Sequence, residues 1–154
     1  MKPLDGHAQL PVFLVGESLG AAVVLQEAAL DPRIRGVVAG ASFADLRSIV
    51  ADKTPFFLPD ATRDDALKAA GKEGHFKVDD ASPLLAAPKI TASVLLLHGS
   101  EDTYIPMRHS LRIYGALKAP RRFVRLEGVG HVDILLHDEA WTEIERFIES
   151  ANTT

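Results

Sequence analysis

Cysteine is absent from the 154-residue sequence, which excludes disulfides, thiolate metal sites and a cysteine nucleophile. An excess of basic residues is also absent, because 17 Lys and Arg stand against 21 Asp and Glu, for a net charge of −4. Aromatic and basic residues are not interleaved either. We therefore expect no nucleic-acid binding, which needs a basic footprint.

Long apolar runs are missing as well. No stretch approaches the roughly 20 residues that a membrane-spanning helix needs, and residues 1–6 are too short and too polar for a signal peptide. These absences predict a cytoplasmic protein that does not bind membranes. No two histidines are spaced along one helical face with an acid between them, so neither a metal site nor a cofactor is expected.

The residues that are present have the composition of an ordinary globular domain, with 47% hydrophobic and 25% charged residues. Strand-like and helix-like segments alternate, which predicts an α/β fold: a parallel sheet of about four strands with flanking helices, in one domain over 1–154. Strands are expected at 12–15, 35–41, 94–98 and 123–126, and helices at 19–30, 107–117 and 138–150.

Residues 43–91 are long for a single crossover between strands, and we expect a lid-like or irregular helical section there. Its apolar cluster of Phe56, Phe57 and Leu58 could pack the section onto the sheet or line an acyl-binding surface. Packing is favoured, because apolar clusters in a compact domain are mostly core. Trp141 is expected in the core for the same reason, within the apolar stripe of the last helix.

The pentapeptide Gly-Glu-Ser-Leu-Gly at 16–20 follows an apolar run and precedes a helix-like segment. A strand, a sharp turn flanked by glycines and a helix form a nucleophile elbow, which holds the serine, here Ser18, at the top of a sheet. Small neighbours are needed because the serine backbone is strained there. An ordinary strand-to-helix turn is the alternative interpretation of the same five residues.

An acid and a histidine follow Ser18 along the chain. Asp102 comes just after the apolar run 94–97, and His131 follows a strand-like run and two glycines. Both therefore fall at carboxyl ends of strands, where ligands bind in open α/β sheets. In this interpretation His131 is the general base and then the general acid, and Asp102 holds its tautomer. Glu101 is the alternative acid, while Asp102 could be a helix cap or turn former and His131 a polar loop residue.

The five other histidines have weaker settings. His7 lies near the N-terminus, His75 in a polar loop and His109 at the start of the helix expected at 107–117. His137 opens the last helix, where a capping or surface role is expected. His98 ends the strand before the candidate acid and is expected to shape the loop that follows.

Three motifs together carry a resemblance to a known family: the pentapeptide at 16–20, His-Gly-x-x-Asp-x-x-Ile-Pro at 98–106 and Gly-x-Gly-His at 128–131. Over about residues 10–148 the sequence resembles the α/β-hydrolase superfamily, especially the bacterial branch related to serine aminopeptidases, prolyl oligopeptidase catalytic domains and dienelactone-hydrolase-like esterases. The resemblance implies that Ser18, Asp102 and His131 form a catalytic triad. It also implies that the backbone N–H of Leu19 is one oxyanion donor.

The sequence departs from this family before the first strand. Only about a dozen residues stand where family members usually have several strands and two helices. We therefore expect a truncated α/β-hydrolase fold without the second oxyanion donor, in which the strand at 12–15 is an exposed edge. The chain could be a fragment, a subunit completed by a separate chain, or one copy of a dimer that pairs through this edge; the first is favoured.

The leading functional hypothesis is a serine hydrolase that cleaves an ester, thioester or peptide-like acyl bond in a small molecule or peptide. The alternative is a non-catalytic remnant or subunit that acts, if at all, through a partner at the open sheet edge. A haloperoxidase or lyase with the same three residues is a third possibility, because fold and triad do not fix the reaction.

Overall fold

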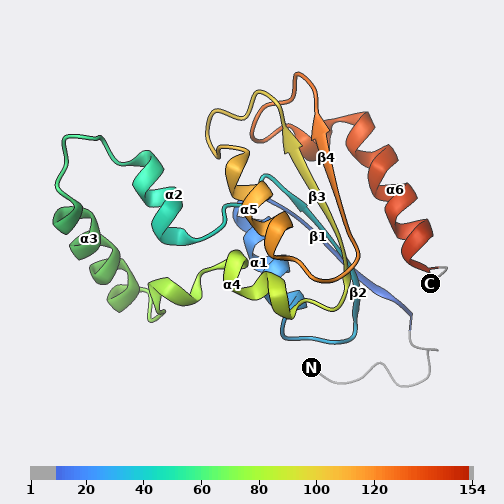
Figure 1. Cartoon of the computed structure of the whole chain (residues 1–154), viewed down its shortest axis with the longest axis horizontal. Helices are drawn as coiled ribbons and strands as arrows, with labels where there is room; N and C mark the ends of the chain where they lie inside the picture. Colours follow the sequence, from blue (N-terminus) through green and yellow to red (C-terminus); the bar gives the residue numbers. More distant parts are fainter. Residues whose placement is uncertain (1–9, 153–154) are drawn as a thin grey trace.

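The computed structural model describes residues 10–152, which form a four-stranded sheet with helices on both faces (Figure 1). The strands are β1 (Val12–Glu17), β2 (Ile34–Gly40), β3 (Ser93–Gly99) and β4 (Arg121–Leu126), in the spatial order β1-β2-β3-β4. All three neighbouring pairs are parallel. The α/β class and the sheet of four parallel strands expected from the sequence are confirmed.

The order of the strands in the sheet determines which face each helix covers. Each strand lies beside the next one in the chain, so right-handed crossovers place the connecting helices on one face. That face carries α1 (Leu19–Ala28), α4 (Pro83–Ala86) and α5 (Arg108–Ala116), whereas α6 (Asp138–Asn152) covers the other (Figure 1). Within residues 10–152, each helix falls short of the length and hydrophobicity of a bilayer span.

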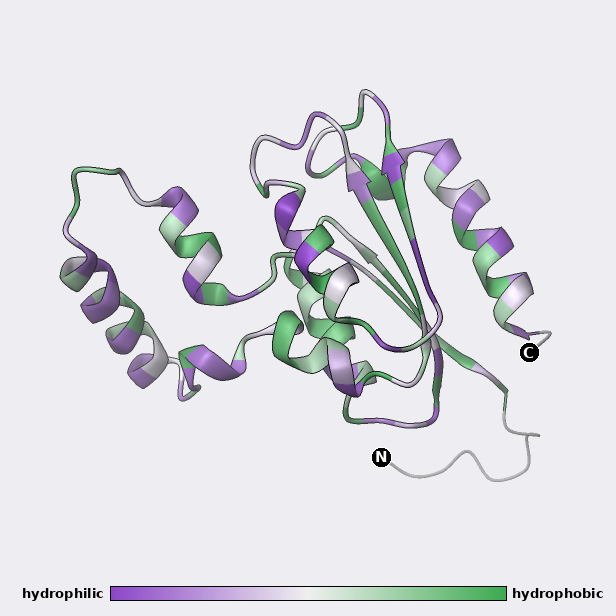
Figure 2. Cartoon of the chain, viewed as in Figure 1, coloured by the Kyte–Doolittle hydropathy of each residue, from purple (hydrophilic) through white to green (hydrophobic). Residues whose placement is uncertain are grey.

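The two central strands are apolar on both sides because helices cover both. In β3, Val94 and Leu96 belong to the core cluster of α1 and α5, whereas Leu95 and Leu97 belong to that of α6. All four side chains are completely buried. A strand buried on both faces is a continuous hydrophobic run rather than an alternating one, and Figure 2 shows this hydrophobic band through the sheet.

Strand β1 lies at one edge of the sheet formed by the described residues. Val12 is 45% exposed and Val15 39% exposed. Phe13 points to the face covered by α6, where its ring meets Phe147 edge-on with the centroids 6.4 Å apart. The helix-covered faces of β1 are thus partly packed, while its outer edge presents unpaired backbone groups of the kind that accept another strand.

The connection between β2 and β3 extends from the body as an arm, residues 46–80 (Figure 1). Its elements are α2 (Leu46–Lys53), α3 (Asp60–Glu73) and the 3₁₀ turn η1 (Val78–Asp80). Two further 3₁₀ turns are η2 (Ala87–Lys89), after α4, and η3 (Ile134–Leu136), before α6. The predicted helical section is therefore two well-formed helices that lie largely outside the sheet layers.

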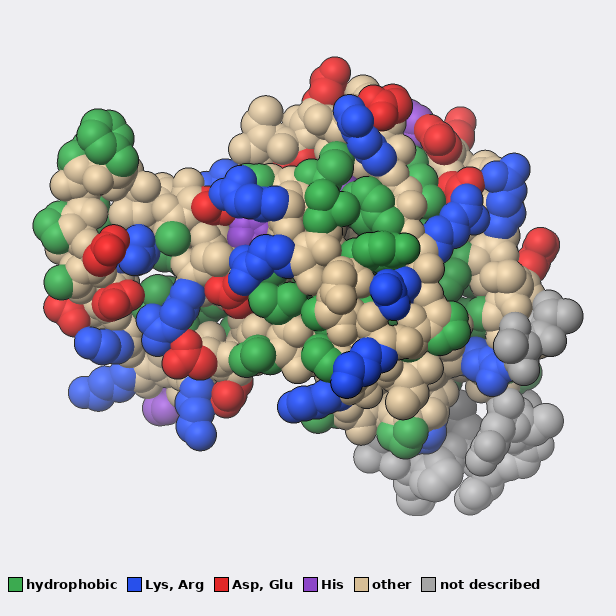
Figure 3. Space-filling model, viewed as in Figure 1, with side chains coloured by type: hydrophobic (Ala, Val, Ile, Leu, Met, Phe, Trp, Pro, Cys, Tyr) green, Lys and Arg blue, Asp and Glu red, His purple; other side chains and the backbone are tan. Residues whose placement is uncertain are grey.

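Two expectations about buried aromatic residues are wrong. Phe56, Phe57 and Leu58 do not pack onto the sheet: they lie in the loop between α2 and α3 and are 100%, 74% and 37% exposed. Figure 3 shows hydrophobic side chains at the outer end of the arm. Trp141 is 46% exposed on α6, with its indole N–H donating to the carbonyl of Leu135. The amino-acid composition does not indicate that residues 46–80 extend away from the sheet. The expectation that apolar clusters are buried, which holds for compact domains, therefore does not apply to this arm.

Candidate active site

Ser18 occupies a strained turn between β1 and α1. Its backbone has φ 55° and ψ −117°, a positive φ that non-glycine residues rarely adopt. Such conformations cost about 1–3 kcal/mol and persist only where the surroundings enforce them. Here the Ser18 N–H donates to the carbonyl of Gly40 at the end of β2, with a distance of 2.8 Å. The connection from β1 to α1 is therefore a strained turn that is fixed against the end of β2.

The glycine before the turn is required by close packing. A Cβ on Gly16 would lie 2.4 Å from the carbonyl oxygen of Gly20, so no side chain fits between the strand and the helix. Helix α1 begins at Leu19, the residue directly after Ser18. The first N–H groups of a helix have no acceptor within the helix and carry partial positive charge. The amide of Leu19 is therefore suited to an anionic oxygen near Ser18.

The three side chains singled out in the sequence form a continuous hydrogen-bonded chain. Ser18 Oγ lies 2.9 Å from His131 Nε2, and His131 Nδ1 lies 2.8 Å from Asp102 Oδ2. Because an ionised carboxylate only accepts hydrogen bonds, Nδ1 carries the hydrogen and donates a hydrogen bond to Asp102. In the neutral ring Nε2 then has a free lone pair, which accepts the hydroxyl proton of Ser18.

The carboxylate of Asp102 is completely buried and fully engaged. Its Oδ1 accepts the backbone N–H groups of Tyr104 and Ile105, each at 2.8 Å, while Oδ2 faces His131. Asp102 thus forms a local turn and orients the histidine at once, so the two sequence interpretations of this residue are compatible. Glu101, the alternative acid, is exposed, and its backbone N–H donates to Val129.

His98 supports the loop that carries Asp102. Its side chain is completely buried, and burial lowers its pKa below the ordinary value of 6.5, which keeps the ring neutral. Nε2 lies 2.9 Å from the carbonyl of Ile105 and must donate to it, so Nδ1 accepts from the hydroxyl of Ser110 at 2.8 Å. Nε2 is also 3.5 Å from the carboxylate of Asp102. The role in loop shaping expected for His98 agrees with these contacts.

The loops after β3 and β4 are linked to each other by their backbones. A Cβ on Gly99 would lie 2.2 Å from the carbonyl oxygen of Val129, so a glycine is needed where the loops meet. Ser100 Oγ accepts the N–H of Gly128 at 2.8 Å, and Gly128 has a φ of 70°. These contacts fix the loop of His131 against the loop of Asp102.

Glu17 is a residue of the site that sequence reasoning missed. It ends β1 beside Ser18, and its Oε1 accepts the backbone N–H of Ile134, three residues after His131, at 3.0 Å. The elbow and the histidine loop are therefore joined directly. The two partners are 117 positions apart, and no spacing in the sequence indicates such a contact.

Tyr104 and Lys53 were missed as well. The ring of Tyr104 lies 4.9 Å from that of His131, tilted by 41°, and is 57% exposed. The ammonium of Lys53, the last residue of α2, lies 4.1 Å from the centre of the tyrosine ring. The arm thus reaches the histidine through an aromatic ring.

The structure places His109 at the start of α5, as expected, but completely buried in a polar contact. Its Nε2 lies 2.7 Å from Asp52 Oδ2, and its Nδ1 accepts the N–H of Ala44 at 3.1 Å. Asp52 also binds Arg108 at 2.5 Å. Burial alone would raise the pKa of Asp52, but hydrogen bonds from His109 and Arg108 outweigh it and hold that pKa below 3.8.

The remaining histidines lie away from this arrangement. His75 is exposed after α3, with a positive φ of 55°. His137 precedes α6 and is half-buried, and its carbonyl accepts the backbone N–H groups of Ala140 and Trp141. Its buried Nδ1 has no hydrogen-bond partner among the described residues, so no side-chain cap is formed there by this nitrogen. His7 lies outside the described residues.

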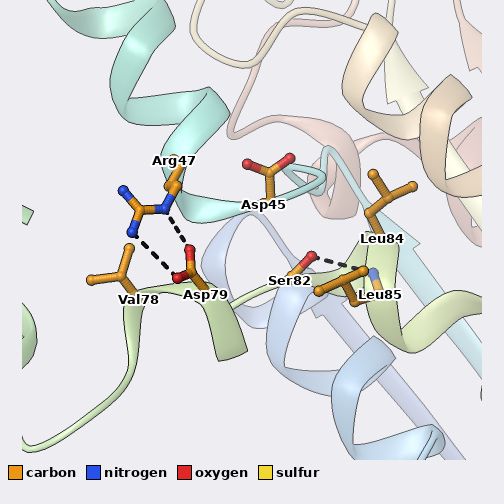
Figure 4. Close-up of a pocket in the computed structure, with 7 residues that line it drawn as sticks. All are labelled: Asp45, Arg47, Val78, Asp79, Ser82, Leu84 and Leu85. Carbon is orange, nitrogen blue, oxygen red and sulfur yellow. Dashed lines mark hydrogen bonds and ion pairs between the residues drawn. The ribbon is translucent and has the colours of Figure 1, made fainter. Parts of the chain in front are cut away.

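A cavity of about 340 Å³ lies at the base of the arm, away from Ser18 (Figure 4). Arg47 and Asp79 form an ion pair in its wall, and Ser82 Oγ accepts the N–H of Leu85 (Figure 4). Its wall consists of Asp45, Arg47, Val78, Asp79, Ser82, Leu84 and Leu85. None of the three residues of the hydrogen-bonded chain lines this cavity.

Residues 9–139 match the sequence profile of the prolyl oligopeptidase family. The chain belongs to this family. It is therefore an α/β-hydrolase superfamily member, as the three motifs predicted, and a member of a family of hydrolases.

The chain is similar to several proteins that are longer than it is. Human alpha/beta hydrolase domain-containing protein 17B is 33% identical over 60 residues, which is 39% of this chain and 21% of that protein. The acylaminoacyl peptidase of Pyrococcus horikoshii has a TM-score of 0.67 at 17% identity, over 92% of this chain and 24% of its own. Acetyl xylan esterase 1 from Thermoanaerobacterium sp. JW/SL YS485 has a TM-score of 0.63 at 20% identity, over 84% and 43%. The chain thus spans less than half the length of each of these proteins.

Proposed function

We propose that this chain carries the catalytic residues of a serine hydrolase that cleaves an ester, thioester or peptide-like acyl bond. The observation that carries the proposal is the continuous hydrogen-bonded chain from Ser18 through His131 to the buried Asp102. Membership of the prolyl oligopeptidase family supports the same reaction class.

In the proposed reaction, the Ser18 hydroxyl attacks the substrate carbonyl while His131 Nε2 takes its proton. Asp102 stabilises the imidazolium that forms and keeps its ring oriented. The N–H of Leu19 donates to the oxygen that becomes negative in the tetrahedral intermediate. His131 then protonates the leaving group, and water, deprotonated by the same nitrogen, releases the acyl group from Ser18.

Hydrolysis of p-nitrophenyl acetate by the purified chain tests this proposal. We expect turnover that falls to background in Ser18→Ala, with an unchanged far-UV circular dichroism spectrum. The matched control is Ser93→Ala, the same chemical change at the first residue of β3, which should keep full activity. Equal rates in Ser18→Ala and the wild type, or no turnover by a folded wild type, would contradict the proposal.

A second candidate, a non-catalytic subunit that acts through a partner at β1, is favoured by one observation. The edge of β1 is open in the described residues, and Val12 and Val15 on it are partly exposed. Such an edge can accept a strand from a second copy or another chain. Size-exclusion chromatography with light scattering separates the cases. An inactive monomer supports the non-catalytic candidate, and an active dimer or complex supports a completed enzyme.

A further inference from the structure

A cation that the acyl-transfer steps do not use lies near the ring of His131. Lys53 Nζ lies 4.1 Å from the centre of the Tyr104 ring, which lies 4.9 Å from the centre of the His131 ring. These two distances place the ammonium within about 9 Å of the imidazole. Cation–ring contacts of this length are attractive, so the arrangement is a favourable one.

Lys53 is held in this place by the residue before it. Asp52 binds Arg108 at 2.5 Å and His109 at 2.7 Å, both in the first turn of α5. His109 is completely buried, and its other nitrogen is fixed by the N–H of Ala44. The last turn of α2 is therefore anchored to the body of the protein. The position of Lys53 over Tyr104 follows from this anchor rather than from the flexible side chain alone.

The charge of Lys53 is left without a carboxylate. Asp52 is shared by Arg108 and His109, and the carboxylate of Asp102 is buried and directed at His131. Among residues 10–152, no carboxylate lies within ion-pair distance of Lys53, which is exposed. Tyr104 is more than half exposed as well. A positive charge and the free part of an aromatic ring are therefore presented together beside His131.

We propose that Lys53 and Tyr104 form a substrate subsite that selects acyl chains ending in a carboxylate. The ammonium would pair with the carboxylate, and the methylene groups between it and the scissile carbonyl would lie along the tyrosine ring. This inference rests on the proposed hydrolase function and names its substrate class. A helix C-terminus also attracts a basic residue, but that attraction does not require the contact with Tyr104.

The test compares two esters that differ in one charge: mono-p-nitrophenyl adipate and the same compound with its free carboxylate capped as a methyl ester. We expect Lys53→Met to reduce the ratio of kcat/KM for the acid over the capped ester by about fivefold, the upper range for an exposed ion pair. The change should appear in KM rather than kcat, because the pair forms equally in ground and transition states. It should also shrink as salt is added.

Two variants control the comparison. Lys53→Arg keeps the charge and should keep the ratio. Lys72→Met makes the same chemical change in the last turn of α3, a helix that lies out along the arm, and should also keep the ratio. An unchanged ratio in Lys53→Met, or an equal fall in Lys72→Met, would overturn the subsite.

A binding measurement separates failure of the subsite from failure of the hydrolase function. In Ser18→Ala, monomethyl adipate should shift the NMR signals of the Tyr104 ring, with a dissociation constant that rises about fivefold when Lys53→Met is added. Binding that depends on Lys53 without turnover of either ester by the wild type supports the subsite and overturns the hydrolase function. Turnover of both esters with no Lys53-dependent binding overturns the subsite and leaves the hydrolase function standing.

Discussion

Two histidine–aspartate pairs of nearly equal length lie in the described part of the chain. His131 is 2.8 Å from Asp102, and His109 is 2.7 Å from Asp52. The difference is at the far nitrogen of each ring. In His131 that nitrogen faces the hydroxyl of Ser18, whereas in His109 it accepts a backbone N–H. A histidine beside a carboxylate is therefore not enough to identify a base, because His109 has no free lone pair.

The surroundings of the two pairs differ in the same sense. The side chain of His131 is 13% exposed, so part of its ring is open to solvent, while that of His109 is 1% exposed. Asp102 is completely buried and held by two backbone N–H groups, whereas Asp52 is 22% exposed and shared with Arg108. One pair links the partly exposed ring of His131 beside Ser18 to a buried carboxylate, and the other joins the arm to the body.

The largest expected difference between the pairs is in activity. His131→Gln should lower kcat/KM for p-nitrophenyl acetate by about a thousandfold or more, because the general base is lost. His109→Gln should stay within a few-fold of the wild type once corrected for the folded fraction. Steady-state kinetics on both variants at neutral pH checks this. Similar losses in both would mean that the comparison does not distinguish base from anchor.

A smaller effect is expected at Glu17, which joins the elbow to the loop of His131. Glu17→Leu leaves the N–H of Ile134 without its acceptor and should cost about 1–3 kcal/mol of folding free energy. The displaced loop should also lower kcat by about tenfold. Glu17→Gln retains an oxygen acceptor and should restore most of both. Urea denaturation and kinetics measure the two effects, and a Gln variant as impaired as the Leu variant would exclude the positioning role.

The smallest effect is expected in how the stability contributed by Asp52, which joins the arm to the body, depends on pH. The pKa of Asp52 is held below 3.8 in the folded protein, so its contribution to stability is present above the unfolded pKa. It is lost as the pH falls through the folded pKa, below about 4. Asp52→Asn should therefore lower the free energy of unfolding near pH 6 and lose its deficit near pH 2. A deficit that is constant over this range would contradict the assignment.

The strands of the sheet, and the expectation that the three candidate residues lie near one another, could be predicted from the sequence for physical reasons. Apolar runs bounded by turn residues identify strands that are buried on both faces. Parallel strands then place Ser18, Asp102 and His131, each just after a strand, at one edge of the sheet. Their catalytic roles stay a prediction that the experiments above address.

The contacts between distant segments could not be predicted in this way. Glu17 with Ile134 and Asp52 with His109 each join side chains whose positions depend on how loops pack, and neither pair has a characteristic spacing. The prediction for Phe56 and Phe57 was wrong because apolar side chains are often buried but are not always so. Their hydrophobicity alone therefore does not show that they pack in the core. Both the missed contact of Asp52 and the misplaced Phe56 and Phe57 lie in the arm, which has few contacts with the sheet.

The most direct measurement of the central claim is reaction with a fluorophosphonate, which modifies serines that are activated by a neighbouring base. Intact-mass spectrometry should show one adduct per chain, and peptide mapping should place it on Ser18, with no adduct in Ser18→Ala and strongly slowed labelling in His131→Gln. A folded wild-type protein that stays unmodified, or that is modified at another residue, would contradict the account.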